Sequence, residues 1–182
     1  MADQGFPGQH TTTTTMTATS TTVQTDIRYD PLYLRTLPGM LKVAQVALNF
    51  LGFMTIAISG TAVYSQASFF DSIAGFAFWF SGILLAFYLF HIVEKFFNIP
   101  WLKIELGFCA LWTVFYLIAS TMVAGLMSVS AALGVAAFFG FCAMVCYGYD
   151  AWLKYQGVVS GDLAQGERHV QKTTSTVTSP AY

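Results

Sequence analysis

Charge is scarce in this chain and unevenly placed. Asp, Glu, Lys and Arg make up 9% of the 182 residues and hydrophobic residues 55%, whereas about a quarter of a soluble globular domain is charged. None of these four residue types occurs in residues 43–70, 72–93 or 106–149. A membrane helix needs about 20 apolar residues, so the first two stretches can each hold one span and the third can hold two. The composition therefore excludes a soluble domain and predicts an all-α bundle of four transmembrane helices.

The predicted spans divide the chain into four parts. We expect a Thr-rich, disordered N-terminal tail and a polar, disordered C-terminal tail, because neither has enough apolar surface to bury. Between the first tail and the first span, tyrosines alternate with cations, which is typical of a segment at the membrane interface, and Pro38-Gly39 should interrupt the chain there. The expected parts are residues 1–25 (tail), 26–42 (approach segment), 43–152 (membrane domain) and 153–182 (tail), with spans Val43–Val63, Ile73–Val93, Leu106–Leu126 and Val129–Tyr149.

Basic residues should all lie on one side of the membrane. An even number of spans places both tails and the middle loop on the same side, and all eight Lys and Arg residues fall in those parts. Lys42, Lys95, Lys103 and Lys154 stand close to helix ends, where the positive-inside rule is strongest. We therefore predict that both termini are cytoplasmic, in a multi-pass protein of the plasma membrane or of secretory-pathway vesicles.

Several chemical signatures are missing. No GxSxG, HExxH or phosphate-binding loop occurs, and no His, Cys and carboxylate cluster has the spacing of a metal site. The cysteines lie within predicted helices, which disfavours an extracellular disulfide. The net charge of −1 and the lack of a basic run give no reason to expect nucleic-acid binding. We predict a protein that is not an enzyme and that uses no cofactor or metal.

Polar residues of the predicted first helix share one face. Lys42, Gln45 and Asn49 are spaced i, i+3, i+7, and amides in lipid need partners, so this face should point into the bundle. It would serve interhelical hydrogen bonding or, alternatively, an ion or proton path. Near the cytoplasmic rim we expect mutually compensating charges that reach toward the aqueous interface: Glu94, Lys95, Lys103, Glu105, Asp150 and Lys154.

Two further features concern the predicted fourth helix. Ala132, Ala136 and Gly140 follow one another at i+4, which forms a ladder of small residues that permits close helix approach within the bundle or, secondarily, between copies. Cys146 lies near the cytoplasmic end and is a candidate for S-palmitoylation. The other interpretation of Cys146 is a small core residue.

Two short motifs point to a family. The segment Leu34–Ala44, which reads LRTLPGMLKVA, resembles the start of the first helix in chemokine-like-factor-type MARVEL transmembrane proteins. Ile99-Pro100-Trp101 resembles their middle loop, and the likeness spans about residues 26–152. The resemblance implies a protein that organises membrane domains, sterol-rich ones among them, or that regulates the trafficking and surface stability of other transmembrane proteins.

Two hypotheses of function follow. In the first, the chain is a non-enzymatic membrane adaptor, whose partners are lipids and other transmembrane proteins met laterally, because the predicted outer loops are too short to form a receptor domain. In the second, the chain is a small channel or transporter, assembled as an oligomer around Lys42, Gln45 and Asn49. The lack of a charged residue at the middle of any predicted span disfavours the second.

Overall fold

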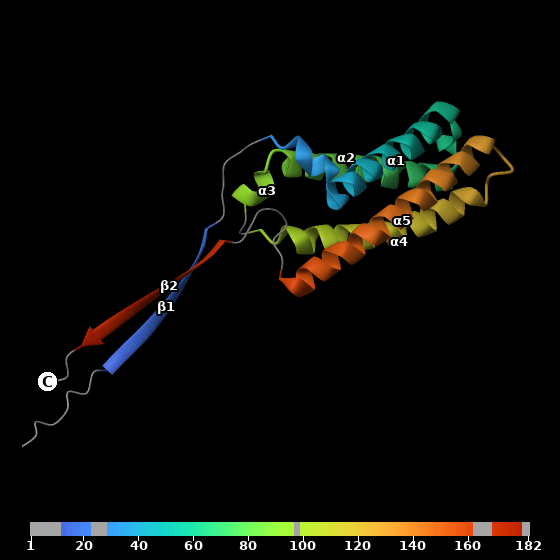
Figure 1. The fold of residues 1–182 in the computed structure, drawn as a ribbon. Coiled ribbons are helices and arrows are strands. Elements are labelled where there is room, and N and C mark those ends of the chain that lie inside the picture. Colours follow the sequence, from blue (N-terminus) through green and yellow to red (C-terminus); the bar gives the residue numbers. More distant parts are fainter. Residues whose placement is uncertain (1–11, 23–28, 97–98, 162–168, 180–182) are drawn as a thin grey trace, which may run out of the picture. The chain divides into compact units, whose positions relative to one another are not determined.

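Four long helices build the membrane domain. The computed structural model describes residues 12–22, 29–96, 99–161 and 169–179. Within these residues, α1 (Leu37–Ser59), α2 (Ser65–Leu89), α4 (Trp101–Ala124) and α5 (Ala131–Ser160) are each long and apolar enough to cross a membrane. The predicted four-helix, all-α fold is confirmed (Figure 1). Shorter helices connect them: η1 (Pro31–Arg35), η2 (Thr61–Val63) and α3 (Ile92–Lys95).

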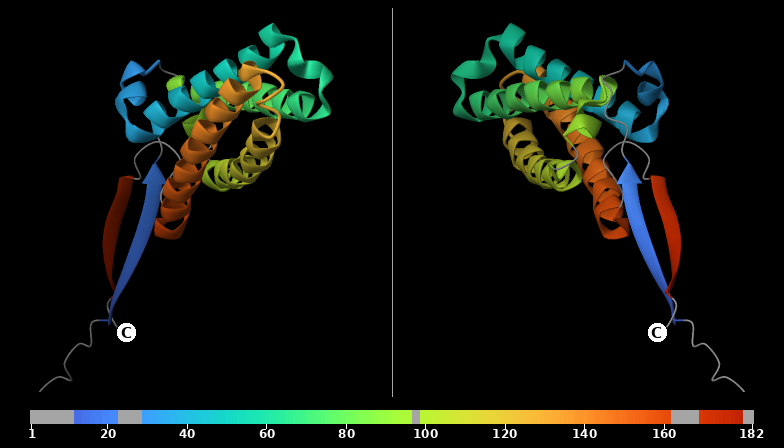
Figure 2. Two further views of the ribbon diagram at one scale, coloured as in Figure 1. Left: turned by 90° about the vertical axis from the view of Figure 1, so that its right-hand side faces the viewer. Right: turned by 90° about the vertical axis from the view of Figure 1, so that its left-hand side faces the viewer.

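The helices run antiparallel, so the bundle has two distinct ends. At the tail end, α1 begins, α5 ends, and α3 joins α2 to α4; at the loop end, residues 60–64 and 125–130 make the two remaining connections (Figure 1). Helix α5 packs against both α1 and α4, and α2 packs against α1 and α4. Figure 2 shows α5, in orange, between α1 and α4.

The helices are longer than the predicted spans. Two charged residues that the prediction placed outside the spans lie inside helices. The prediction assigned Asp71 to an outer loop, but α2 already begins at Ser65 and Asp71 lies in its second turn. Glu105 lies in the second turn of α4, which begins at Trp101. Each carboxylate lies inside a helix and beyond its first turn, so a charged residue does not mark the helix boundary.

The expected interruption at Pro38-Gly39 is absent. Thr36 caps α1, and its hydroxyl accepts a hydrogen bond from the Gly39 amide at 3.2 Å. Proline is tolerated in a first turn because its missing N–H would have no partner there. A Cβ on Gly39 would collide with the Tyr33 carbonyl oxygen, so glycine lets η1 fold closely against the start of α1.

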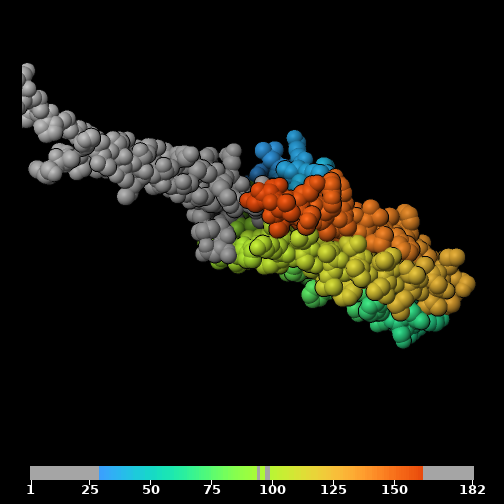
Figure 3. Space-filling model, turned by 90° about the horizontal axis from the view of Figure 1, so that it is seen from below, coloured from blue at the N-terminus to red at the C-terminus, as the bar shows by residue number. Residues whose placement is uncertain are grey.

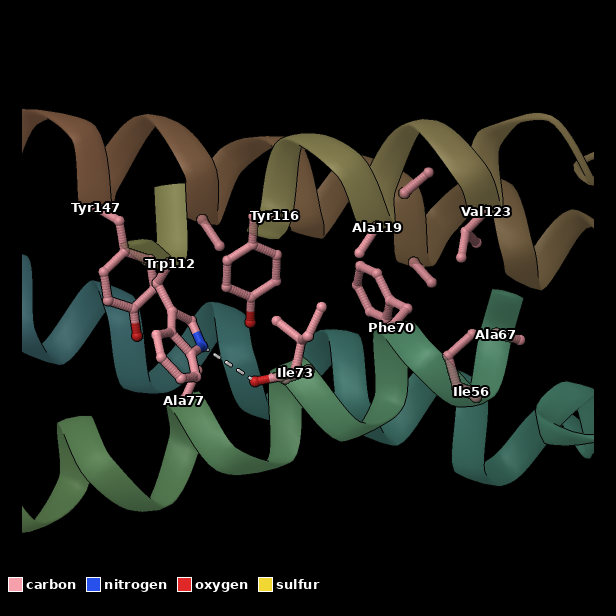
Figure 4. Close-up of a cluster of buried hydrophobic side chains, with 14 of the residues drawn as sticks. Ile56, Ala67, Phe70, Ile73, Ala77, Trp112, Tyr116, Ala119, Val123 and Tyr147 are labelled. Atoms are coloured by element: carbon pink, nitrogen blue, oxygen red, sulfur yellow. Dashed lines mark hydrogen bonds between the residues drawn. The ribbon is translucent and has the colours of Figure 1, made fainter. Parts of the chain in front are cut away.

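The apolar core fills the loop-end half of the bundle. Phe70 and Tyr116 meet edge to face, with ring centroids 6.0 Å apart, and Ile56, Val123 and Leu133 pack around them without exposure to solvent. Trp112 joins α4 to α2, because its indole N–H donates to the Ile73 carbonyl at 3.3 Å (Figure 4). This half of the core is closed by large side chains that belong to all four long helices.

Two strands lie in the Thr-rich segments, which were predicted as disordered tails. β1 (Thr12–Thr22) and β2 (His169–Ser179) form an antiparallel two-stranded ribbon, in which Thr12 pairs with Ser179. Threonine is β-branched and favours strands, and neither segment contains proline or glycine. The C-terminal tail was also predicted to begin at residue 153, whereas α5 continues to Ser160. The remaining tail residues, 1–11, 23–25, 162–168 and 180–182, lie outside the described residues.

Candidate functional site: a buried charge cluster

Four charged side chains from three helices meet inside the tail-end half of the bundle. We call Lys42 (α1), Glu105 (α4), Asp150 and Lys154 (both α5) the charge cluster. Lys42 and Asp150 are fully buried, Glu105 is 1% exposed and Lys154 is 7% exposed. Two cations and two carboxylates balance, and balance is what a buried set of charges requires in a low-dielectric medium.

Lys42 is the centre of this cluster. Its ammonium lies 2.5 Å from Glu105 Oε1 and 2.9 Å from Asp150 Oδ2. It also donates to Gln45 Oε1, one turn along α1, at 3.2 Å. The contacts with Gln45 and Asp150 are hydrogen bonds, and the contact with Glu105 is an ion pair. One side chain of α1 thereby binds both α4 and α5.

Glu105 joins the other three helices. Its Oε2 lies 2.7 Å from the Lys154 ammonium and accepts a hydrogen bond from the Tyr88 hydroxyl, on α2, at 2.7 Å. The Lys154 ammonium also lies 5.1 Å from the centroid of the Tyr88 ring, within the range of a cation–π contact. Glu105 thus contacts side chains from α1, α2 and α5.

Asp150 collects donors from two helices besides its ion pair. Gln45 Nε2 donates to Asp150 Oδ2 at 2.9 Å, and the Cys109 thiol donates to the same oxygen at 3.4 Å. Because Gln45 accepts from Lys42 and donates to Asp150, its amide closes a ring of three side chains. This arrangement fixes the orientation of α1 against α5.

A second polar layer lies deeper in the bundle. We call Asn49 (α1), Ser81 (α2), Tyr116 (α4) and Tyr147 (α5) the tyrosine cluster. Asn49 donates to Tyr147 Oη at 2.8 Å and accepts from Tyr116 Oη at 2.6 Å. Ser81 and Tyr147 share a further hydrogen bond of 2.7 Å. All four long helices contribute one side chain, so this layer also ties the whole bundle together.

The segment before α1 covers the tail end next to the charge cluster. The Asp30 amide donates to the Leu89 carbonyl at 3.0 Å, and the Tyr33 ring stacks on Tyr88 with centroids 5.1 Å apart. Burial, and next to it the negative charge of Glu105, raises the pKa of the Tyr33 phenol. Tyr33 therefore stays uncharged and shields the Tyr88–Glu105 pair from one side.

His91, which follows α2, adopts an unusual backbone. Its φ of 55° lies in the left-handed region, which non-glycine residues rarely occupy. Its Nε2 lies 3.8 Å from Asp30 Oδ2, and the residue is 3% exposed. The chain turns sharply at His91, which allows α3 to begin directly after α2.

The structure brings together two groups of residues that were predicted separately, the polar face of the first helix and the charges of the cytoplasmic rim. The polar face Lys42, Gln45 and Asn49 is buried, and its first two members contact the rim residues Glu105 and Asp150. The rim charges were expected to reach outward, but Glu105, Asp150 and Lys154 turn inward because each finds an opposite charge inside. Lys95 and Lys103 are exposed, and the side chain of Glu94 lies outside the described part of the chain.

The ladder of α5 lies partly at a close helix contact. Ala136 and Gly140 are buried and Ala132 is half-buried. A Cβ on Gly140 would collide with the Ser120 hydroxyl and approach the Phe70 ring to 2.6 Å, so glycine permits α5 to lie close to α4. Figure 3 shows α4 and α5 side by side on one face of the bundle. Cys146 is half-buried on α5.

Sequence reasoning missed the partners on the other helices. Tyr147, Asp150 and Lys154 are spaced i, i+3, i+7, the same spacing as Lys42, Gln45 and Asn49, and would have indicated a second polar face. Glu105, Cys109 and Tyr116 also share one face of α4. Tyrosine and cysteine were interpreted as apolar, which hid both patterns. The missed residues are Ser81, Tyr88, Cys109, Tyr116 and Tyr147.

The arrangement is suited to holding helices together. Every charge of the cluster has an opposite charge within 2.9 Å. Among the described residues, no group of three His, Cys, Asp or Glu side chains is placed to hold a metal ion. Toward the loop end, the polar layers stop at the core around Phe70 and Val123.

Comparison with known proteins agrees with this architecture. Residues 33–153 match the MARVEL family, which is described as a membrane-associating domain. The chain is also similar to plasmolipin of Mus musculus, with 26% identity over 138 residues that cover 71% of this chain and 76% of plasmolipin. No solved structure matches the chain. The matched segment contains α1, α2, α4, most of α5, the charge cluster apart from Lys154, and the whole tyrosine cluster, and the chain belongs to the MARVEL family of four-span membrane proteins.

Proposed function

We propose that this MARVEL protein is a non-enzymatic membrane organiser that regulates the trafficking or surface stability of other transmembrane proteins. The observation that carries the proposal is the shortness of both loop-end connections, residues 60–64 and 125–130. Neither can fold into a binding domain. Partners on that side of the membrane must therefore be met through the helices themselves.

The outer surface of the bundle supports a lateral mode of contact. Large apolar side chains face outward along the helices, among them Trp79 at 69% exposed and Phe138 at 63% exposed. A lipid environment satisfies such a surface, and another transmembrane helix packs on it equally well. The buried polar layers hold the four helices together independently of either neighbour.

An oligomeric channel, the alternative function, would need a polar helix face that is free to line a pore. Lys42, Gln45 and Asn49 would have to line a pore between copies, yet their described partners all belong to the same chain. An opening through the bundle would also have to displace Phe70 and the core around it. The adaptor hypothesis requires no such rearrangement.

Three finer points stay predictions. The assignment to chemokine-like-factor-type members rests on the motifs at residues 34–44 and 99–101. A preference for sterol-rich membranes and the acylation of Cys146 rest on the family resemblance and on the position of that cysteine near the end of α5.

Quantitative surface proteomics tests the proposal. Cells with and without the protein are compared, with total protein levels measured in parallel and the protein re-expressed as a control. We expect a few transmembrane proteins to fall at the surface while their synthesis is unchanged, and to return on re-expression. An unchanged surface proteome would contradict the proposal.

A further inference from the structure

Asp71 is a charge without a counterpart. In the sequence, it is the only Asp, Glu, Lys or Arg in residues 43–93, and residues 106–149 contain none. All eight cations fall in the parts of the chain before residue 43, between residues 94 and 105, or after residue 149. The loop-end half of the four helices therefore has one negative charge and nothing to neutralise it.

The position of Asp71 places this charge below the membrane surface. α2 begins at Ser65, and at 1.5 Å per residue Asp71 stands about 9 Å along the helix. A helix of 25 residues exceeds the hydrocarbon thickness of about 30 Å by only about 7 Å. The short aspartate side chain reaches outward less far than a lysine or arginine would.

Within the described residues, no side chain satisfies the carboxylate of Asp71. Asp71 is half-buried, and its Oδ1 has no hydrogen-bond partner among the residues that the structure describes. No ion pair within the described part of the chain involves it. In the charge cluster, by contrast, each carboxylate has at least one lysine. Among the described residues, the bundle thus pairs the buried charges of one end and leaves the carboxylate of the other end, with its Oδ1 buried, without a partner.

The neighbourhood of Asp71 allows another helix to approach. Ser68 and Ser72 are exposed on the same side of α2, and the Ser72 hydroxyl is already bonded to the Ser68 carbonyl of its own helix at 2.9 Å. Gly75, one turn further on, packs against Phe53 of α1, so the small exposed residues beside Asp71 are the two serines. Small residues at such a position permit close backbone contact between membrane helices.

We propose that Asp71 is the docking residue for a transmembrane helix of another protein that carries a lysine or arginine at the same depth. The inference rests on the proposed function and names the chemistry of its partner. A second copy of this chain does not fit, because in a parallel dimer it would bring another Asp71 and no cation to that level. Like charges at this depth repel, so the surface selects a different protein.

The test uses the full-length protein in phosphatidylcholine liposomes with synthetic transmembrane peptides. One polyleucine peptide carries a lysine at the depth of Asp71, a second carries it at the opposite end, and a third carries glutamine in its place. Association is measured by energy transfer between labelled peptide and labelled protein. We expect the first peptide to associate more strongly than the others by about threefold or more, the size of a typical interhelical polar contact.

Substitutions connect this preference to the carboxylate. Asp71→Asn should abolish the preference for the peptide with lysine at the depth of Asp71, and Asp71→Glu should keep that preference. Asp71→Lys should instead favour a peptide with glutamate at the same depth. Ser72→Ala, on the same face, is the matched control and should leave it unchanged. Equal association of all peptides, as expected if lipid headgroups satisfy the carboxylate, would overturn the inference. A surface proteome that still depends on the protein would then leave the proposed function standing.

Discussion

Lys42 on α1 and Asp150 on α5 are 108 residues apart in the chain, and their charged atoms lie 2.9 Å apart in the bundle. Both side chains are fully buried. Glu105 lies on the other side of the same ammonium and brings α4 into the contact. One lysine thus connects the first, third and fourth spans of the chain.

Replacing Lys42 should destabilise the bundle strongly. Lys42→Met leaves two buried carboxylates with one cation, and breaking a buried pair costs about 3–5 kcal/mol of unfolding free energy. The measurement is denaturant unfolding of the purified protein in lipid nanodiscs. Lys103→Met, at an exposed site of α4, should change the free energy by less than about 0.5 kcal/mol.

Removing a whole ion pair should be tolerated better than removing one partner. The double variant Lys42→Met with Asp150→Asn leaves Glu105 and Lys154 as a balanced pair. We expect it to recover more than half of the stability that Lys42→Met loses, in the same unfolding experiment. A double variant less stable than the single one would mean that charge balance does not hold the cluster together.

Gly140→Ala should weaken the contact between α4 and α5. The added methyl group would collide with the Ser120 hydroxyl and the Phe70 ring, and such overpacking costs about 1–3 kcal/mol. Gly82→Ala is the matched control, since nothing lies within 4 Å of a Cβ at that position. Thermal unfolding of both variants in detergent distinguishes them, and equal melting temperatures would contradict the close approach at Gly140.

The polar face of α1 should act in stability and not in transport. Gln45→Leu with Asn49→Leu removes three interhelical hydrogen bonds, each about 0.6 to 1.7 kcal/mol in a membrane, so the double variant should lose about 2–5 kcal/mol. Thr121→Val, whose hydroxyl bonds only the Leu117 carbonyl of its own helix, is the control. Ion flux through reconstituted liposomes that disappears in the double variant would favour a channel instead.

Both tails should face the cytoplasm. The described cations of the membrane domain, Lys42, Lys95, Lys103 and Lys154 among them, lie toward the tail end, and basic residues near helix ends stay on the cytoplasmic side. Epitope tags at either terminus should be stained only after cells are permeabilised, whereas a tag inserted in residues 60–64 should be stained on intact cells. The reverse staining pattern would show that both termini face away from the cytoplasm.

Much of the fold follows from hydropathy, and the site follows only in part. Four spans could be predicted because lipid requires long apolar helices, and an inward-facing α1 because Lys42, Gln45 and Asn49 share a face. The partners of that face depend on which helices become neighbours and in what register. No local pattern specifies that α1 meets Asp150 on α5, so the ion pairs required the tertiary structure.

The errors have a common physical origin. Charged residues were interpreted as boundaries of helices, yet Asp71 and Glu105 lie one to two turns inside theirs. The polarity of these two residues concealed the helices that contain them.

The sequence separation between Lys42 and its partners also sets the order in which the growing chain acquires them. Ribosomes add about 5–20 residues per second, so the 108 residues between Lys42 and Asp150 take roughly 5–20 s to synthesise. During that interval Lys42 first lacks both of its carboxylates, then has Glu105 alone, and gains Asp150 last. A chain that ends before Glu105 therefore presents an unneutralised lysine that the finished protein conceals, and a chain that ends before Asp150 lacks one of the two ion pairs of that lysine.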